Sequence, residues 1–198
     1  PGQGVHGAYP HKGLDPIHLA GHVILALNGI ISRRIDPFDA AVISLGSIHA
    51  GRADNVIPES VEIGGTIRYE RPEVQKKVHA EIERAISVAR ALGGDYRLEF
   101  EFGGGPVVND AGMVDVIKQV GAELLGADAV APSEKGMGAE DFSFMLQARP
   151  GAFARLGQGG AEGGCFLHNS TYDFNDDVIP LGAGYLAALA EAAMPLRA

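Results

Sequence analysis

The sequence is poor in the residues that build disulfides, membrane spans and nucleic-acid surfaces. Cys165 is the only cysteine among 198 residues, which excludes an intrachain disulfide and favours a reducing, cytoplasmic compartment. No apolar run approaches the ~20 residues of a transmembrane helix, so we expect no membrane partner. Lys and Arg number 16 against 25 Asp and Glu, and this net charge of -9 argues against nucleic acid as a partner. A small molecule is the better expectation.

Glycine, in contrast, is in excess. The chain has 28 glycines, about twice the ordinary usage of ~7%, with no collagen-like period. They therefore predict turns and close backbone approaches. The apolar fraction of 46% predicts one or two globular domains for this length. The chain opens with Pro1 in a segment already rich in Gly and His, which predicts that it is the later part of a longer protein.

The first half of the chain alternates between strand and helix patterns. We expect strands at 3–8, 41–48, 61–69 and 96–102, and helices over 15–32 and 71–93. The order β-α-β-β-α-β predicts an α/β (α+β) fold class with a ferredoxin-like, four-stranded antiparallel sheet and both helices on one face. The run Gly103–Pro106 predicts a boundary between a domain at 1–104 and another at 105–198.

The second half is mainly helical in its pattern. We expect helices at 111–125, 139–147 and 177–193, with one short buried strand at 152–156. A single strand cannot cover the apolar sides of three helices. These helices therefore require a sheet supplied from elsewhere.

Several histidines are candidate metal ligands. His168 lies among Asn and Asp residues, a usual setting for a ligating imidazole, although a loop histidine among solvated acids fits the same pattern. One ligand does not make a site, since a catalytic zinc takes about three protein ligands. His18 and His22 share one helix face at i, i+4, where a polar face or a subunit interface is the favoured interpretation.

Other residues are candidates for substrate chemistry. His6 lies between glycines, so it could donate a hydrogen bond to a carbonyl oxygen, or it could be an ordinary turn histidine. Asn55 and Arg68 fit a clamp for a substrate carboxylate, although Arg68 also fits a surface charge at a strand end. Glu140 and Asp141 fit either functional carboxylates or acids at a helix N-terminus.

Five motifs, taken together, match one known pattern. They are Gly2–His11, Val42–Arg68, Met137–Ser143, Pro150–Phe153 and Leu167–Asn175. In this order they resemble segments of the metal-dependent amidohydrolase and aminoacylase-type metallopeptidase family, which includes hippurate hydrolase, N-acyl-amino-acid amidohydrolase and indole-acetyl-amino-acid hydrolase. The resemblance covers nearly the whole chain.

The resemblance implies an architecture and roles for the candidate residues. Residues 1–104 would be a lid that also makes a homodimer, and 105–198 the C-terminal part of an α/β metallohydrolase catalytic domain whose N-terminal part is absent. The implied roles are carbonyl polarisation across the dimer for His6, binding of the substrate's carboxylate end for Asn55 and Arg68, metal ligation for His168, and positions near the site for Glu140 and Asp141.

The resemblance also implies what this chain lacks. Family members hold two divalent metal ions, Zn or Mn, and hydrolyse the amide bond of N-acyl amino acids or small peptides. Their other metal ligands and their general base lie upstream of the lid, so we expect this chain not to bind both metals and to be inactive alone. The alternative is a stand-alone module for dimerisation or small-molecule binding, with 17–31 and 41–48 as its interface.

Overall fold

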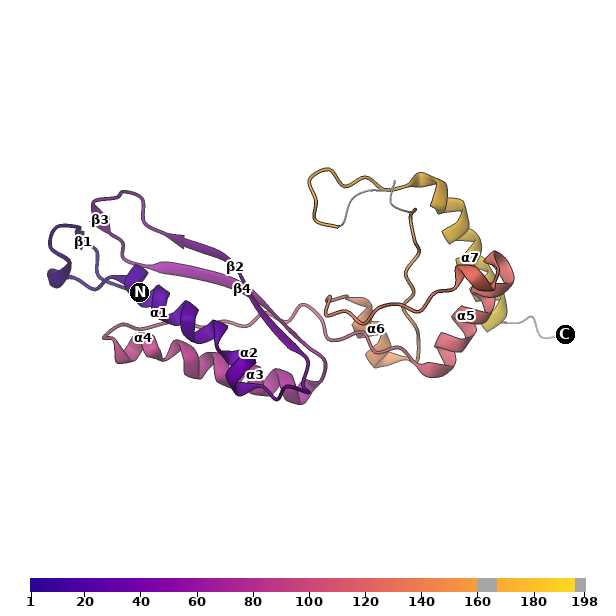
Figure 1. Ribbon diagram of the computed structural model, residues 1–198, viewed down its shortest axis with the longest axis horizontal. Helices are drawn as coiled ribbons and strands as arrows, with labels where there is room; N and C mark the ends of the chain where they lie inside the picture. Colours follow the sequence, from indigo (N-terminus) through magenta and orange to yellow (C-terminus); the bar gives the residue numbers. More distant parts are fainter. Residues whose placement is uncertain (160–166, 195–198) are drawn as a thin grey trace. The chain divides into compact units, whose positions relative to one another are not determined.

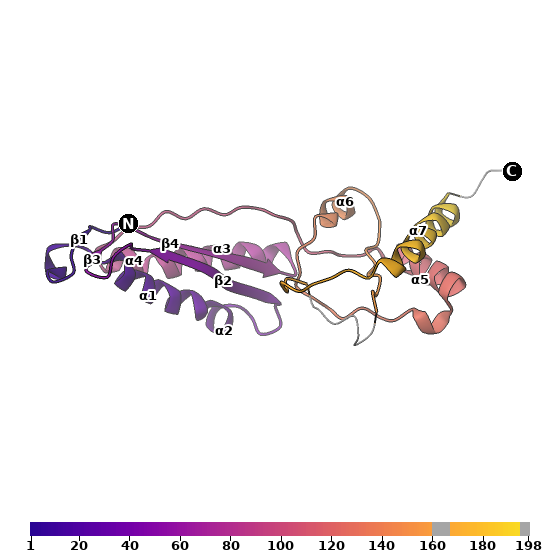
Figure 2. The same cartoon turned by 90° about the horizontal axis from the view of Figure 1, so that it is seen from above.

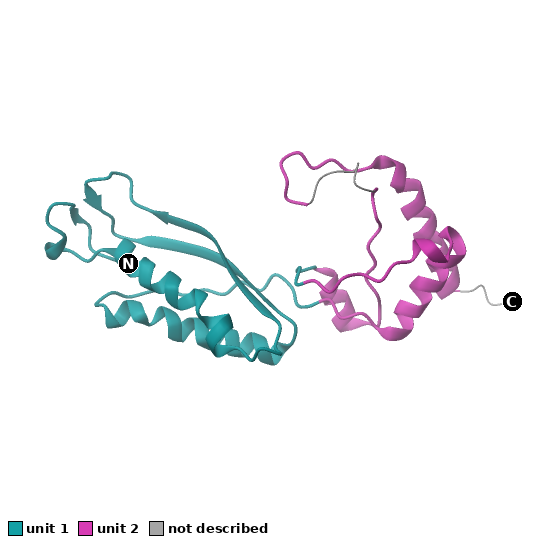
Figure 3. Ribbon diagram, in the orientation of Figure 1, with its two compact units in different colours: residues 1–106, 137–140 teal, residues 107–136, 141–198 magenta. Residues whose placement is uncertain are grey.

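The chain divides into two compact units (Figure 3). The computed structural model describes residues 1–159 and 167–194, so Cys165 lies outside the described residues. Unit 1 comprises residues 1–106 and 137–140, and unit 2 comprises residues 107–136 and 141–198. Each unit is built from its own set of elements.

Unit 1 contains four strands and four helices besides a short 3-10 turn (Figure 1). The elements in chain order are β1 (Val5–His6), η1 (Pro10–Lys12), α1 (Pro16–Asn28), α2 (Ile30–Arg34), β2 (Ala41–Ala50), β3 (Val56–Ile57), β4 (Val61–Tyr69), α3 (Pro72–Ile86) and α4 (Val88–Ala91). Strands β2 and β4 form a long antiparallel ribbon, and β1 pairs with β3 in a second, shorter one. The helices pack on one face of the long ribbon (Figure 2).

The boundaries of the helices follow from local chemistry. The Asp15 carboxylate accepts hydrogen bonds from the backbone N–H groups of Ile17 and His18, at 2.9 and 3.3 Å, and so caps α1. Pro16 fits the first turn because its missing N–H would have no helical partner there. Gly29 then separates α1 from α2, so the predicted single helix is interrupted.

The core of unit 1 is the contact between the helices and the long ribbon. Its fully buried members come from α1, α2, α3 and the turn after α2, namely Leu27, Ile30, Ile35, Val74, Val78, Ile82 and Ile86. Ile43, Leu45 and Ile67 pack against this cluster from β2 and β4. The ribbon bends at a bulge where Gly46 has no partner, since Leu45 pairs with Gly65 and Ser47 with Gly64.

The mixed α/β class is confirmed, and β4 coincides with the predicted strand. The prediction of one four-stranded sheet is wrong: the described strands form two two-stranded ribbons. The segment 96–102 keeps the predicted alternation, with Tyr96 and Leu98 half-buried against the core, yet it is not assigned as a strand. Alternation fixes which side chains face the core, whereas a strand also requires a hydrogen-bonded neighbour.

Unit 2 is helical within its described residues. Its elements are α5 (Ala111–Leu125), η2 (Ala127–Ala129), α6 (Phe142–Ala148), η4 (Asp176–Val178) and α7 (Ile179–Ala193). The predicted strand at 152–156 is not formed, although Asn109 and Phe153 exchange two hydrogen bonds of 3.2 and 2.8 Å. Helix α7 buries none of its residues, and Leu186 is 67% exposed. This exposure agrees with the expectation that these helices need a sheet from elsewhere.

Candidate functional site

The β1–β3 ribbon brings His6 and Asn55 together at one end of unit 1. His6 pairs with Val56, and the N–H of the next residue, Gly7, donates a 2.7 Å hydrogen bond to the carbonyl of Asn55. A Cβ at position 7 would lie only 3.0 Å from that oxygen, so glycine permits the approach. Sequence spacing alone does not indicate this pairing, because forty-eight intervening positions separate His6 from Asn55.

The imidazole of His6 is exposed and held in a defined orientation. Its Nδ1 accepts a 3.0 Å hydrogen bond from the backbone N–H of Ala8. In the neutral ring the proton therefore resides on Nε2, which is left as a donor. The ring also lies 5.7 Å from the ring of Tyr9, centroid to centroid. This geometry suits donation of one hydrogen bond to an incoming oxygen.

Tyr9 is a neighbour that the sequence reasoning did not single out. Its ring contacts His6 on one side and His11 on the other, with the latter centroid at 6.4 Å, and the ammonium of Lys12 lies 4.9 Å above it. The only signal in the sequence was its place between two histidines. Tyr9 supports the loop that carries His6.

Arg68 lies far along β4 from this histidine. It pairs with Val42 near the end of the ribbon, and its guanidinium donates a 2.9 Å hydrogen bond to the carbonyl of Ile67. It follows Val61, at the β3 side, by seven positions of extended strand, which corresponds to ~24 Å. Within one chain, Arg68 and Asn55 therefore do not form the predicted clamp around one small carboxylate.

His168 lies in a turn of unit 2 with an exposed side chain. Its φ of 68° is the only positive value among the described residues other than glycine. Such a backbone is uncommon for a residue with a Cβ and is frequent at functional positions. The side chain of Asn169, next in the chain, accepts hydrogen bonds from the N–H and hydroxyl of Thr171, both 2.9 Å, and so shapes the turn.

Glu140 and Asp141 precede a helix rather than opening one. Helix α6 begins at Phe142, three residues later than predicted, and Asp141 occupies its N-cap position. The Asp141 side chain makes no capping hydrogen bond. Glu140 is half-buried and Asp141 is exposed. Both carboxylates thus stay candidates for a role other than helix capping.

The described residues do not fit a two-metal centre. Across residues 1–159 and 167–194, no group of three or more His, Cys, Asp and Glu side chains lies close enough to hold a metal ion. His18 and His22 do face each other on α1, with ring centroids 4.8 Å apart, but they make only a pair. A dinuclear centre requires several ligands to each ion, so His168 could supply one part of it.

Comparison with known proteins finds relatives along nearly the whole chain. Residues 1–91 match the family model of the M20 peptidase dimerisation domain. Over this range the chain resembles the dimerisation domains of M20 peptidases. It is 34% identical over 197 residues to IAA-amino acid hydrolase ILR1-like 2 of Arabidopsis thaliana, covering 96% of this chain and 44% of that protein. It is also 34% identical to hippurate hydrolase of Campylobacter jejuni over 191 residues, covering 96% and 49%.

A solved structure supports the fold of this chain. The Bacillus subtilis YXEP protein, described as a dinuclear metal binding peptidase from the M20 family, aligns with a TM-score of 0.68 at 24% identity. The alignment covers 96% of this chain and 48% of that one. The chain thus spans about half the length of the curated relatives it matches. Among its described helices, none is both long and apolar enough to cross a bilayer.

Proposed function

We propose that this chain is the lid and the C-terminal catalytic portion of an amidohydrolase that cleaves N-acyl amino acids or small peptides. The observation that carries the proposal is the His6 imidazole, which is oriented by Ala8 so that Nε2–H is a free donor beside Asn55. The names of two relatives, hippurate hydrolase and an IAA-amino acid hydrolase, both describe amide bonds to amino acids. They support this substrate class.

The proposed roles follow from the charges that amide hydrolysis creates. Addition of water to the amide carbon places negative charge on the carbonyl oxygen before the C–N bond breaks. A donor already aimed at that oxygen stabilises the transition state more than the substrate. We assign this role to His6, with Asn55 beside it. Arg68 can bind the carboxylate of the amino-acid part through its fork of donors.

The distance between these residues favours a site shared by two copies. His6 and Asn55 lie at one end of the long ribbon and Arg68 near the other, ~24 Å along β4. An N-acyl amino acid cannot span that distance. In a homodimer, His6 and Asn55 of one subunit can meet Arg68 of the other. This arrangement agrees with the dimerisation domain matched over residues 1–91.

The dimer surface that we propose is α1 with the outer edge of β2. Ile17 and Leu25 are 50% and 73% exposed on α1, and His18 and His22 lie on the same exposed side. Within the described ribbons β2 pairs only with β4, so its other edge can pair with a second strand. Apolar helix residues beside an open strand edge are suited to association of two copies.

The metal ions and the general base enter the proposal from outside the described residues. His168 would supply one ligand. Glu140 and Asp141, in the Met137–Ser143 motif, would be positions near the site. Two divalent ions, Zn or Mn, would belong to the complete enzyme, with this chain not holding both. The exposed faces of α5 and α7 would then cover a sheet from the rest of that enzyme. The single cysteine favours the cytoplasm as its compartment.

Complementation between two variants tests the shared site. A dimer of His6→Ala subunits lacks the donor in both sites, and a dimer of Arg68→Lys subunits lacks the fork in both. Mixed dimers of the two variants restore one intact site. We expect each variant alone to lose binding of hippurate in saturation-transfer NMR. In the mixture, each mixed dimer has one intact site out of two. Binding per mixed dimer should therefore be about half of that per dimer of the unmodified chain. His11→Ala is the matched control and should bind normally.

The result distinguishes the shared site from a site within one chain. If the mixture binds no better than either variant, the two residues act within one chain or not at all, and the composite site is wrong. Size-exclusion chromatography with light scattering supplies the dimer mass, and a monomer would contradict the arrangement. An assay of the 198-residue chain with hippurate and added Zn or Mn should show far less than ~1 turnover per second. Ordinary turnover would mean that its own residues suffice.

A further inference from the structure

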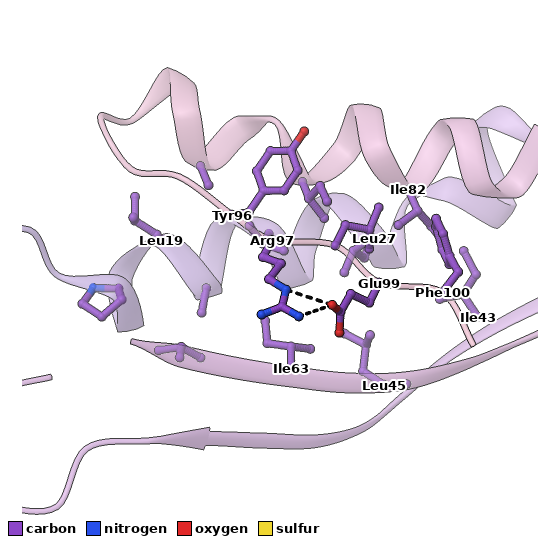
Figure 4. A pocket seen from close by; sticks show the side chains of 18 of the residues that line it. Leu19, Leu27, Ile43, Leu45, Ile63, Ile82, Tyr96, Arg97, Glu99 and Phe100 are labelled. Carbon is purple, nitrogen blue, oxygen red and sulfur yellow. Dashed lines mark hydrogen bonds and ion pairs between the residues drawn. The ribbon is translucent and has the colours of Figure 1, made fainter. Parts of the chain in front are cut away.

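Helix α1 of unit 1 has an inner side in the core and an opposite side that is exposed. Leu19 and Leu27 point from the inner side into an apolar groove that is lined by α1, α3 and β4 (Figure 4). Helical periodicity places His18, His22 and Leu25 together on the opposite side. All three residues are exposed. The two histidines therefore lie on a surface that the single chain leaves uncovered.

The histidine pair is arranged as two ligands of one metal ion would be. His18 and His22 are one helical turn apart, at i and i+4, and their ring centroids lie 4.8 Å apart. Zinc binds imidazole nitrogens at ~2.0 Å, so two such nitrogens on one tetrahedral ion lie ~3.4 Å apart, which rings at this spacing can provide. Neither imidazole has a hydrogen-bond partner among the described residues. Their ring nitrogens are therefore available as ligands.

The surroundings of the pair favour a divalent transition-metal ion that this chain binds incompletely. Helix α1 contains no Lys, Arg, Asp or Glu, so no cationic side chain of the helix repels such an ion. Imidazole is the common protein ligand of zinc, copper and nickel ions. Within the described residues no third His, Cys, Asp or Glu joins the pair. A structural zinc ion takes four protein ligands, so two more have to come from another chain.

A glycine on the same exposed side indicates how another chain can approach. Gly21 lies in the interior of α1, where glycine is less favourable than alanine. A Cβ at this position would meet nothing within 4 Å beyond the adjoining backbone of its own helix. Packing within the chain therefore does not require glycine there, whereas a close approach from outside does. Ile17 and Leu25, one turn to either side, are 50% and 73% exposed and offer apolar surface for that contact.

We propose that His18 and His22 are half of a metal site that the same two histidines of a second copy complete. Four imidazoles then bind one divalent transition-metal ion between two antiparallel α1 helices. In a two-fold contact both copies present the same surface, so each His18 lies opposite the His22 of the other copy. Gly21 lets the two helices approach. The inference rests on the dimer proposed above, whose surface includes α1, and adds a metal ion as its link.

Zinc binding and dimer affinity test the shared site together. The 198-residue chain is stripped with EDTA and titrated with Zn²⁺, while analytical ultracentrifugation measures the monomer–dimer equilibrium and calorimetry measures the stoichiometry. We expect Zn²⁺ to lower the dissociation constant of the dimer at least about tenfold relative to EDTA. The double variant His18→Ala and His22→Ala should lose this effect and bind about half an equivalent less Zn²⁺ per chain. His11→Ala, an exposed histidine outside α1, is the matched control and should behave as the parent.

Two further variants separate a shared site from a pair that binds the ion within one chain. Ile17→His combined with His18→Ile keeps the composition and uses only exposed positions, but it moves the two histidines onto different sides of the helix. Gly21→Leu keeps both histidines and places a bulky side chain where the second helix approaches. We expect both variants to lose the zinc-dependent tightening of the dimer.

Every outcome bears on the shared site. One Zn²⁺ per chain at the histidine pair, or tightening that Gly21→Leu retains, would overturn the completion by a second copy. Absence of tightening in the parent, or equal tightening in the double variant, would overturn the metal site itself. The EDTA arm keeps these results apart from the dimer: a dimer that zinc does not tighten refutes the metal link alone, whereas a monomer in both EDTA and zinc refutes the proposed dimer as well.

Discussion

The centre of unit 1 can be tested by truncating Val78 on α3. Its side chain is completely buried, at 0% exposure, within the cluster formed by α1, α2 and α3. Val78→Ala removes two methyl groups, which costs ~1.6 kcal/mol in transfer free energy, and the cavity left behind adds about 1 kcal/mol. The better helix propensity of alanine returns ~0.5 kcal/mol. We therefore expect the free energy of unfolding to fall by about 2 kcal/mol.

The measurement is urea denaturation followed by far-UV circular dichroism. Hydrogen exchange of the α3 amides assigns the transition to unit 1, where the change should appear as the same loss of opening free energy. Val56→Ala is the matched control, because Val56 is 50% exposed on β3 and should lose less than ~0.5 kcal/mol. Equal losses for the two variants, or a Val78→Ala loss below ~0.5 kcal/mol, would refute the assignment of the core.

Three further predictions concern other positions in unit 1. Gly65→Ala should lower the free energy of unfolding by about 1–3 kcal/mol in the same urea assay, because the new Cβ would lie 2.5 Å from the carbonyl oxygen of Ser44. Gly46→Ala is the control and should be nearly neutral, because a Cβ at that position meets open space. Asp15→Ala should cost ~1 kcal/mol by removing the α1 cap, and Asp15→Asn should restore most of it. Burial lowers the pKa of His79. The neutral ring therefore contributes its full stability above a pH of ~6.5, and this stability is lost as the pH falls from there through the folded pKa. His79→Gln should flatten that part of the stability–pH curve, and an unchanged slope would contradict the prediction.

Sequence patterns predicted the elements of unit 1 better than their pairing. Residues 61–69 alternate around Ile63 and Ile67, and they form β4 over the whole range. Residues 96–102 alternate equally well, yet none of the described strands pairs with this segment. The period of two reports which face a side chain occupies. It carries no information on whether a backbone neighbour is present, and that neighbour decides whether a sheet forms.

For the candidate site, too, sequence patterns indicated single residues better than the contacts between them. The glycines around His6 correctly indicated a close backbone approach, but the partner that Gly7 approaches is the carbonyl of Asn55, which spacing alone could not reveal. The pairing of Asn55 with Arg68 as one clamp also looked reasonable in sequence, since only a short stretch separates them. Most of that stretch is strand β4, and an extended strand keeps its ends apart.

The two units differ in how much apolar surface each one buries by itself. In unit 1, the buried cluster around Val78 forms although the groove beside it is open, because the helices and the β2–β4 ribbon already enclose those side chains. In unit 2, Val120 is the only buried large hydrophobic side chain among the described residues, and α7 buries none. Burial of apolar surface is the main source of folding free energy. Unit 1 therefore has a core of its own, whereas we expect unit 2 to gain most of its core from an external sheet.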